Sequence, residues 1–172
     1  LKMYKTSYKV LKNPAEKAAQ LIFDNKIIGW FQGRLEFGDR ALGNRSILAD
    51  ARDAKMKDKV NETIKYREPF RPFAPSILQE YLDEYFIEAA PTPFMEKVFP
   101  IKPDKHAIIP AVTHIDGSGR LQTVNKEQNL LYYELIHHFY QLSGVPIILN
   151  TSFNLNGEPI VSSPKDAIRT FI

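Results

Sequence analysis

The chain contains no cysteine. This absence excludes a disulfide framework, a thiolate metal site and a cysteine nucleophile. It suits a reducing compartment, and we expect the protein to be cytoplasmic. The sequence also has no apolar run that approaches the length of a membrane span, and no signal peptide at its start. We therefore expect no membrane among its partners.

The chain has little net charge, formally +3 over 172 residues. Residues 34–71 contain ten Lys or Arg and seven Asp or Glu, and so account for the whole positive excess. A surface that binds nucleic acid is typically far more basic. The distribution indicates one local site for an anion, and nucleic acid is not an expected partner.

Several catalytic motifs are missing as well. His106 and His114 are eight residues apart and belong to no H-E-x-x-H or similar metal-ligand pattern. The sequence has no G-x-S-x-G elbow, no Walker A loop and no conspicuous carboxylate pair. Neighbouring His137 and His138 cannot face one ligand together from a helix, so we interpret both as structural. Positive charge, hydroxyls, amides and glycines remain, and these suit phosphoryl or nucleotidyl transfer.

Helix and strand patterns alternate along the chain, which is 44% hydrophobic and long enough for one domain with a core. Asn13-Pro14 and Ser163-Pro164 are typical helix starts. Helices are expected over residues 14–23, 52–64, 79–87, 126–142 and from 164 onward. Strands are expected over residues 27–32, 46–49, 73–78, 94–100 and 145–149, with a hairpin over 112–124. This order predicts an α/β or α+β fold.

The sequence begins without methionine and stops inside an expected helix. We therefore expect residues 1–172 to form a single domain of a longer protein.

The segment from residue 64 to 76 concentrates positive charge at Lys65, Arg67 and Arg71. Pro69 and Pro72 forbid a helix through its middle and favour extended backbone. In an extended segment Lys65 and Arg67 would share one face, because side chains alternate along a strand. An ammonium beside a guanidinium suits a polyanion such as phosphate. The alternative is a solvated basic edge strand.

Residues 33–46 alternate three glycines with three arginines, Arg34, Arg40 and Arg45. Glycines allow backbone N–H groups to approach a ligand closely, and arginines can close on a phosphate. The same pattern would fit an ordinary loop broken by glycines.

Residues 150–159 form a polar turn after an apolar run and include Ser152 and Asn154. Ligands favour such strand ends in open α/β sheets, although an Asx-rich turn has the same composition. Arg120 and Gln122 are expected on one face of the second strand of the hairpin.

Four of these blocks resemble, in the same order, the C-terminal domain of O-carbamoyltransferases, a family that includes NodU nodulation proteins and the cephamycin and tobramycin carbamoyltransferases. The blocks are Gly33–Ala49, Ile64–Ser76, His114–Gly117 with Arg120–Val124, and Asn150–Pro159. Together they span nearly the whole chain. Asp39 stands where the pattern of the family has proline.

The resemblance implies a YrdC-like fold, a twisted mixed β-sheet with flanking helices. YrdC-like proteins carry a Lys-x-Arg element and a Ser-x-Asn element around an ATP-binding cavity. Here these elements fall on Lys65-Tyr66-Arg67 and Ser152-Phe153-Asn154. The resemblance further implies that the domain makes carbamoyl-adenylate from carbamoyl phosphate and ATP. An N-terminal domain of the same protein would bind a metal and transfer the carbamoyl group to an acceptor hydroxyl.

We expect Lys65 and Arg67 to be the central, catalytic anion binders. The supporting candidates for substrate and ATP binding are Arg34, Arg40, Arg45, Arg71, Arg120, Ser152 and Asn154. Mg²⁺ is expected to accompany ATP, held mainly by its phosphates, and no metal ligand is expected within these residues. The sequence does not name the acceptor.

Three other functions remain open at this point. A threonylcarbamoyl-adenylate synthase would require threonine and bicarbonate, and the block at Gly33–Ala49 argues against it. A non-catalytic nucleotide-binding or interaction module would bind ATP, or nothing, without releasing pyrophosphate. A YrdC-like binder of double-stranded RNA fits poorly, because acidic residues lie among the basic ones.

Overall fold

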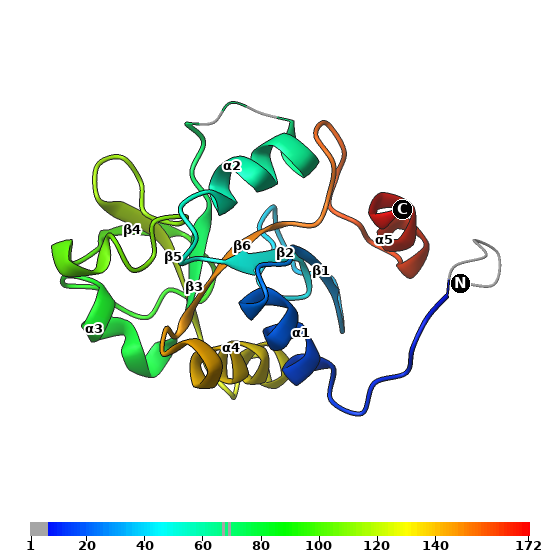
Figure 1. Ribbon diagram of the computed structural model, residues 1–172, viewed down its shortest axis with the longest axis horizontal. Coiled ribbons are helices and arrows are strands. Elements are labelled where there is room, and N and C mark those ends of the chain that lie inside the picture. Colours follow the sequence, from blue (N-terminus) through cyan, green and yellow to red (C-terminus); the bar gives the residue numbers. More distant parts are fainter. Residues whose placement is uncertain (1–6, 67, 69) are drawn as a thin grey trace.

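The computed structural model describes residues 7–66, 68 and 70–172. Within them six strands form one open sheet in the order β1-β2-β6-β3-β5-β4 (Figure 1). The strands are β1 (Ile28–Phe31), β2 (Arg45–Asp50), β3 (Ala74–Leu78), β4 (Lys97–Pro100), β5 (Ser118–Val124) and β6 (Ile147–Ser152). Strands β3 and β5 pair in parallel, and the other neighbouring pairs are antiparallel. The mixed α/β sheet predicted from the sequence is confirmed.

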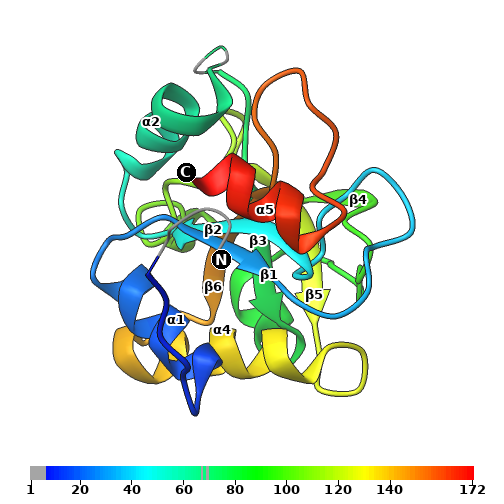
Figure 2. The same ribbon diagram turned by 90° about the vertical axis from the view of Figure 1, so that its right-hand side faces the viewer.

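Helices cover both faces of this sheet (Figure 2). The α-helices are α1 (Pro14–Phe23), α2 (Met56–Val60), α3 (Leu82–Tyr85), α4 (Leu130–Ser143) and α5 (Pro164–Phe171). In Figure 2, α1 and α4 lie together below the sheet, and α2 and α5 lie above it. A π-helical turn, Asn61–Lys65, continues α2. No described helix is both long enough and apolar enough to cross a lipid bilayer.

Local capping signals explain where α1 and α5 begin. The Asn13 side chain accepts a hydrogen bond from the backbone N–H of Glu16 at 3.1 Å, and Pro14 occupies the first helical position. Ser163 and Asp166 form a reciprocal capping box at the start of α5. Hydrogen bonds from Ser163 lower the pKa of Asp166 to about 2. Both predicted helix starts are confirmed. They could be predicted because a helix cap depends on only a few adjacent residues.

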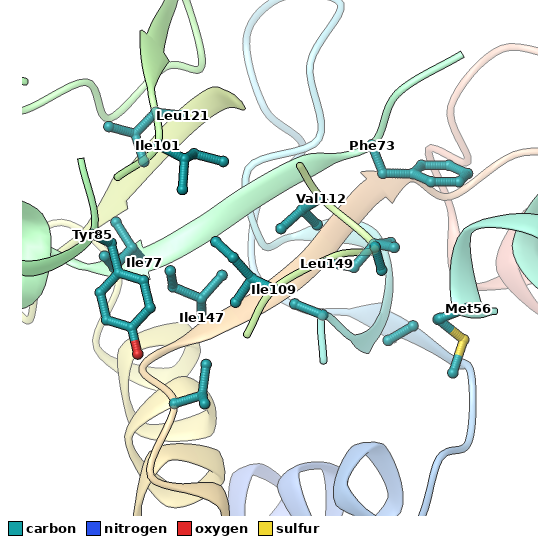
Figure 3. Close-up of a cluster of buried hydrophobic side chains, with 14 of the residues drawn as sticks. Met56, Phe73, Ile77, Tyr85, Ile101, Ile109, Val112, Leu121, Ile147 and Leu149 are labelled. Atoms are coloured by element: carbon teal, nitrogen blue, oxygen red, sulfur yellow. The ribbon is translucent and has the colours of Figure 1, made fainter. Parts of the chain in front are cut away.

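The sheet divides the hydrophobic core into two layers, and β6 contributes side chains to both. Ile147 and Leu149 pack on one face with Met56, Phe73 and other apolar side chains (Figure 3). Ile148 points to the opposite face, where it packs with residues of α1 and α4. Because side chains alternate along a strand, the continuous apolar run of β6 contributes to both layers.

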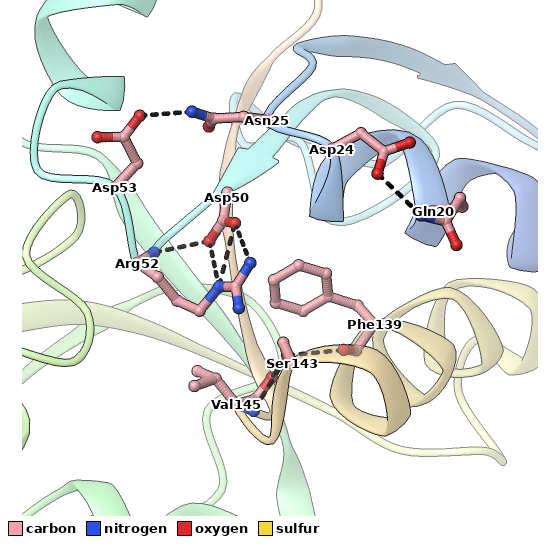
Figure 4. Close-up of polar contacts among 9 residues, drawn as sticks. All are labelled: Gln20, Asp24, Asn25, Asp50, Arg52, Asp53, Phe139, Ser143 and Val145. Carbon is pink, nitrogen blue, oxygen red and sulfur yellow. Dashed lines mark hydrogen bonds and ion pairs between the residues drawn. The ribbon is translucent and has the colours of Figure 1, made fainter.

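A partly buried ion pair connects three elements at the end of β2. Asp50, which is buried, accepts hydrogen bonds from Arg52, with 2.6 Å between Oδ2 and Nη2 (Figure 4). The guanidinium also lies over the rings of Phe23 in α1 and Phe139 in α4, at 4.9 and 5.3 Å from the ring centres. Charge pairing and stacking together fix this corner of the fold.

Long-range pairing overturned one of the strand predictions and placed another strand at the edge of the sheet. The hairpin over 112–124 is wrong, because residues 109–117 form turns and β5 pairs with β3 and β4. The strand over 27–32 exists, but β1 lies at the edge of the sheet and only its Trp30 is buried.

Two helices begin later than their sequence patterns predicted. The helix expected from residue 52 begins at Met56. The helix expected from residue 126 begins at Leu130, where the side chain of Asn129 caps it.

Candidate anion-binding site

Lys65 is the last residue of the π-helical turn after α2, and not part of a strand as predicted. The next residue, Tyr66, has a left-handed backbone conformation with φ of 43°, which ends the helix. The premise that an extended backbone places Lys65 and Arg67 on one face is therefore wrong for Lys65. Arg67 itself lies outside the described residues.

The ammonium group of Lys65 is buried and points to the end of β6. Its Nζ donates to the backbone oxygen of Ser152 at 2.6 Å and to Oδ1 of Asn154 at 2.7 Å. Longer bonds reach the Asn154 backbone oxygen at 3.1 Å and Ser152 Oγ at 3.2 Å. The three hydrogens of the ammonium are shared among these four oxygens, and the contacts fix its orientation. Three predicted site residues, Lys65, Ser152 and Asn154, are thus brought together.

The loop after β6 is held in place around this lysine. Ser152 Oγ donates to Asn154 Oδ1 at 2.7 Å, and Asn154 Nδ2 donates to the backbone oxygen of Glu158 at 2.7 Å. Asn156 Nδ2 reaches the backbone oxygen of Tyr66 at 3.4 Å. The polar turn is therefore a preformed cradle for the Lys65 ammonium and not only a solvated Asx turn.

Arg120 supplies a second positive charge at the same end of the sheet. It lies on β5, half-buried, and burial lowers the pKa of its guanidinium. The nearby charge of Arg40 lowers that pKa further, and Asp39 opposes the shift. Arg40 therefore lies close enough to Arg120 for their charges to interact, although the Arg40 side chain is largely exposed and contacts Asp39 at 3.5 Å.

The strand register places Arg120 and Ser152 near one another. Ala74 of β3 lies opposite Asn150 of β6, and Ser76 lies opposite Gln122 of β5. Arg120 and Ser152 therefore flank the first residues of β3 from its two sides. Neighbouring strands are about 4.8 Å apart, so β5 and β6 are separated by roughly 10 Å.

Arg71 lies just before β3 and completes this arrangement. It pairs with Glu68 at 2.9 Å and, with Tyr66 and Asn156, lines a cavity of about 290 Å³. We call Lys65, Arg71, Arg120 and Arg40 the cationic rim. Within this set, Arg40 and Arg120 interact electrostatically, Arg71 is paired with Glu68, and Arg40 is paired with Asp39. Cations on neighbouring segments of this kind can together hold a polyanion.

The other arginines of the glycine-rich loop lie elsewhere. Arg34 is exposed to solvent. Arg45 is buried, and its guanidinium donates to the backbone oxygens of Gln32, Asn44 and Gly33 at 2.5, 3.0 and 3.2 Å. It also lies 3.6 Å from the centre of the Phe31 ring. Arg45 is therefore placed to brace the loop.

Glu36 occupies the backbone cradle that the glycine pattern had suggested for a ligand. Its Oε1 accepts from the backbone N–H groups of Leu42 and Asn44, both at 2.8 Å, and of Arg45 at 3.2 Å. These three N–H groups are therefore not available to a ligand, because they bind the carboxylate of the loop itself. In the sequence, the one sign of this role was that Glu36 is an acidic residue within a loop that carries three arginines.

A buried amide network holds the loop against the sheet. Gln122 Oε1 accepts from Ser76 Oγ at 2.6 Å and from Asn150 Nδ2 at 2.9 Å. Gln122 Nε2 then donates to the backbone oxygen of Leu42 at 2.9 Å, and Asn150 Nδ2 to that of Ala41 at 3.0 Å. The loop consequently has a fixed position beside Arg120, two residues before Gln122. Sequence reasoning did not identify Asn150 as part of this support.

The loop and β5 also enclose a cavity of about 390 Å³, lined by Phe37, Phe94, Val124, Asn129 and neighbouring residues. Its size suits a small ligand. Among the described residues, no group of three or more His, Asp or Glu side chains could hold a metal ion.

Comparisons with known proteins identify the family and the fold of this chain. Residues 19–172 match the family model described as "Carbamoyltransferase C-terminus". The nodulation protein NolNO of Sinorhizobium fredii is 53% identical over 161 residues, which cover 92% of this chain and 24% of that protein. The chain therefore spans about a quarter of the length of this relative.

Solved structures share the fold at low sequence identity. Sua5 of P. abyssi, in complex with L-threonine, matches 94% of this chain and 45% of its own at a TM-score of 0.65 and 16% identity. Full-length HypF in its phosphate- and nucleotide-bound form matches 96% of this chain and 20% of its own, at a TM-score of 0.59 and 15% identity. Together with the mixed sheet, these neighbours confirm the YrdC-like fold.

Proposed function

Because the chain belongs to the carbamoyltransferase C-terminus family, we propose that this domain binds ATP and carbamoyl phosphate and forms carbamoyl-adenylate. The observation that carries the proposal is the buried Lys65 ammonium, held in a fixed orientation by Ser152 and Asn154. The phosphate- and nucleotide-bound state of the structural neighbour HypF supports a nucleotide as one ligand.

The reaction brings several negative charges together and therefore needs such a rim. Water first cleaves carbamoyl phosphate into carbamate and phosphate. A carbamate oxygen then forms a bond to the α-phosphorus of ATP, while the bond from that phosphorus to the bridging oxygen breaks and pyrophosphate leaves. Fixed cations offset the repulsion between these anions and stabilise the charge on the leaving group.

The residues of the rim have different tasks in this proposal. Lys65 is a compact charge that is already oriented, so little reorganisation is needed when phosphate oxygens approach. Arg120 and Arg40 contact the second anion, and Arg71 closes the site from the start of β3. Arg67, next to this cluster in sequence, is proposed to complete the Lys-x-Arg pair. Mg²⁺ would enter with ATP, held mainly by its phosphates.

We further propose that residues 1–172 are one domain of a longer O-carbamoyltransferase. NolNO, of which this chain covers 24%, has additional sequence that could carry the transfer step. An N-terminal domain of the same protein would bind a metal and pass the carbamoyl group to an acceptor hydroxyl.

Pyrophosphate release from ATP by the natural-length protein tests the proposal. Release should require carbamoyl phosphate and should fall at least about 100-fold in Lys65→Ala, because a fixed charge beside the phosphates is lost. Lys17→Ala is the matched control, since Lys17 is an exposed lysine of α1 on the opposite side of the sheet. Circular dichroism should show that both variants are folded.

Other outcomes would point to the alternative functions. Release that depends on threonine and bicarbonate would identify a threonylcarbamoyl-adenylate synthase. ATP binding without any release by the natural-length protein would identify a nucleotide-binding module and refute adenylation.

A further inference from the structure

His114 lies in a closed turn beside the cationic rim. Its backbone N–H donates to the oxygen of Ser118 at 2.8 Å, and its backbone oxygen accepts from the N–H of Gly117 at 3.0 Å. The side chain, with Arg120, Pro72, Phe73 and Val98, lines a cavity of about 220 Å³. The imidazole is thus placed on a short, rigid turn next to the arginine that we assign to the second anion.

The hydrogen bonds around Ser118 determine which imidazole nitrogen carries the proton. The single hydroxyl hydrogen of Ser118 is donated to Asp116 Oδ1 at 2.6 Å. Ser118 Oγ can then only accept at its 3.1 Å contact with His114 Nδ1, so Nδ1 carries a hydrogen. In the neutral imidazole, Nε2 is therefore a hydrogen-bond acceptor.

This order of bonds also excludes a serine nucleophile here. In a catalytic triad the serine donates its proton to histidine. Here the proton of Ser118 points to Asp116, and the imidazole donates to the serine. Asp116 and Ser118 therefore fix the orientation of the His114 ring and the position of its Nε2.

Two polar atoms of the small cavity's lining residues lack partners in the described part of the chain. His114 Nε2, an acceptor, and Arg120 Nε, a donor, are both buried without a hydrogen bond. Pro72, Phe73 and Val98 have no polar side-chain atoms that could satisfy them. Buried polar groups are normally paired, so the pair calls for a ligand that offers both a donor and an anionic acceptor.

Burial, more than the charges around it, lowers the pKa of His114 and favours the neutral imidazole. Burial lowers its pKa most, and the positive charges of Arg120 and of Lys57 on α2 lower it further against the opposing charge of Asp116. A neutral imidazole keeps the Nε2 lone pair available near pH 7.

We propose that His114 Nε2 accepts a hydrogen bond from the amino group of carbamoyl phosphate, while Arg120 binds an oxygen of the same molecule. This assignment rests on the proposed function and deepens it. His114 would then be a specificity-determining residue that distinguishes carbamoyl phosphate from acetyl phosphate, in which a methyl group replaces the amino group. A site that hydrogen-bonds a substrate N–H rejects an analogue without it, because its own polar atom stays unpaired.

Two variants separate this role from a structural one. His114→Asn can keep a donor to Ser118, in place of Nδ1, but has no acceptor at the position of Nε2. His114→Gln can place its carbonyl oxygen near Nε2. A third variant, Arg120→Lys, is the comparison. It removes the planar guanidinium, which would bind carbamoyl phosphate and acetyl phosphate equally well.

Equilibrium binding of carbamoyl phosphate and of acetyl phosphate to the natural-length protein tests the assignment, with and without α,β-methylene ATP. The wild-type protein should favour carbamoyl phosphate by roughly 10-fold to 100-fold. His114→Asn should lose most of this preference by weakening carbamoyl phosphate alone, and His114→Gln should retain part of it. Arg120→Lys should weaken both ligands by a similar factor.

Several results would overturn the assignment. They are an unchanged preference in His114→Asn, equal weakening of both ligands in that variant, or no binding of carbamoyl phosphate with or without the nucleotide analogue. The measurement needs no turnover, so absence of pyrophosphate release would refute adenylation alone. Release that persists together with an unchanged preference in His114→Asn would refute only the role of His114.

Discussion

Replacing Glu36 tests whether one carboxylate holds the glycine-rich loop beside Arg120. In Glu36→Ala the N–H groups of Leu42, Asn44 and Arg45 lose their common acceptor. Hydrogen bonds to a charged group contribute about 1.5–3 kcal/mol each, but three bonds that share one oxygen do not add fully. We expect a loss of about 3–4 kcal/mol in the free energy of unfolding.

Glu36→Gln is the conservative counterpart of that change. The amide oxygen can still accept the three bonds, but these become neutral and weaker, so we expect a loss of about 1–2 kcal/mol. For a chain of this size 1 kcal/mol corresponds to about 2–4 °C in Tm. The alanine variant should therefore melt about 6–16 °C below wild type, and the glutamine variant about 2–8 °C below it.

Thermal unfolding followed by circular dichroism is the assay, with Glu134→Gln on the exposed face of α4 as the control. The control should melt within about 1 °C of wild type, because exposed substitutions away from specific contacts have small effects. If Glu36→Ala also melted within about 1 °C of wild type, the carboxylate would not be what holds the loop.

Two further predictions concern the backbone and the pH dependence of stability. Gly43→Ala should destabilise the protein by at least about 2 kcal/mol in urea unfolding. Gly43 has φ of 102°, and an added Cβ would lie 2.2 Å from the ring of the buried Tyr132. A smaller loss of stability would mean that the ring moves freely. The pKa of Asp166 falls from 3.8 to about 2 on folding, so its capping contribution is present above pH 3.8 and is lost as the pH falls towards 2. Asp166→Asn should flatten this part of the acid-unfolding curve relative to wild type, and an unchanged curve would show that the cap carries no such linkage.

Elements with local signals could be predicted from the sequence, and elements that depend on distant partners could not. Asn13 and Ser163 each identify a helix start from a few adjacent residues. By contrast, β5 was expected to pair with the residues just before it, and its actual partners are β3 and β4. Strand pairing is decided by packing across the whole sheet, which periodicity along one segment does not reveal.

The same distinction applies to the site. Lys65 was singled out by local positive charge, and Ser152 and Asn154 by a polar turn at a strand end. Only the family resemblance joined the three into one site, and the structure brings them into contact. Spacing alone could not have joined them, since 87 residues separate Lys65 from Ser152. The extended conformation expected for Lys65 was wrong because the helix after Met56 continues through a π-helical turn. The supporting role of Glu36 was missed because it depends on a loop closing on itself.

The long separation between Lys65 and its oxygen partners has a consequence for the order of folding. A chain in which β6 has not yet joined β3 has no cradle for the ammonium, whatever its local helices have done. The proposed anion binding at this lysine would therefore report that the end of β6 has reached its place beside the helix that carries Lys65. A bound polyanion would stabilise the whole domain by mass action rather than one segment of it. In hydrogen exchange, such a ligand should slow the opening of β3 and β6 together, as one cooperative unit.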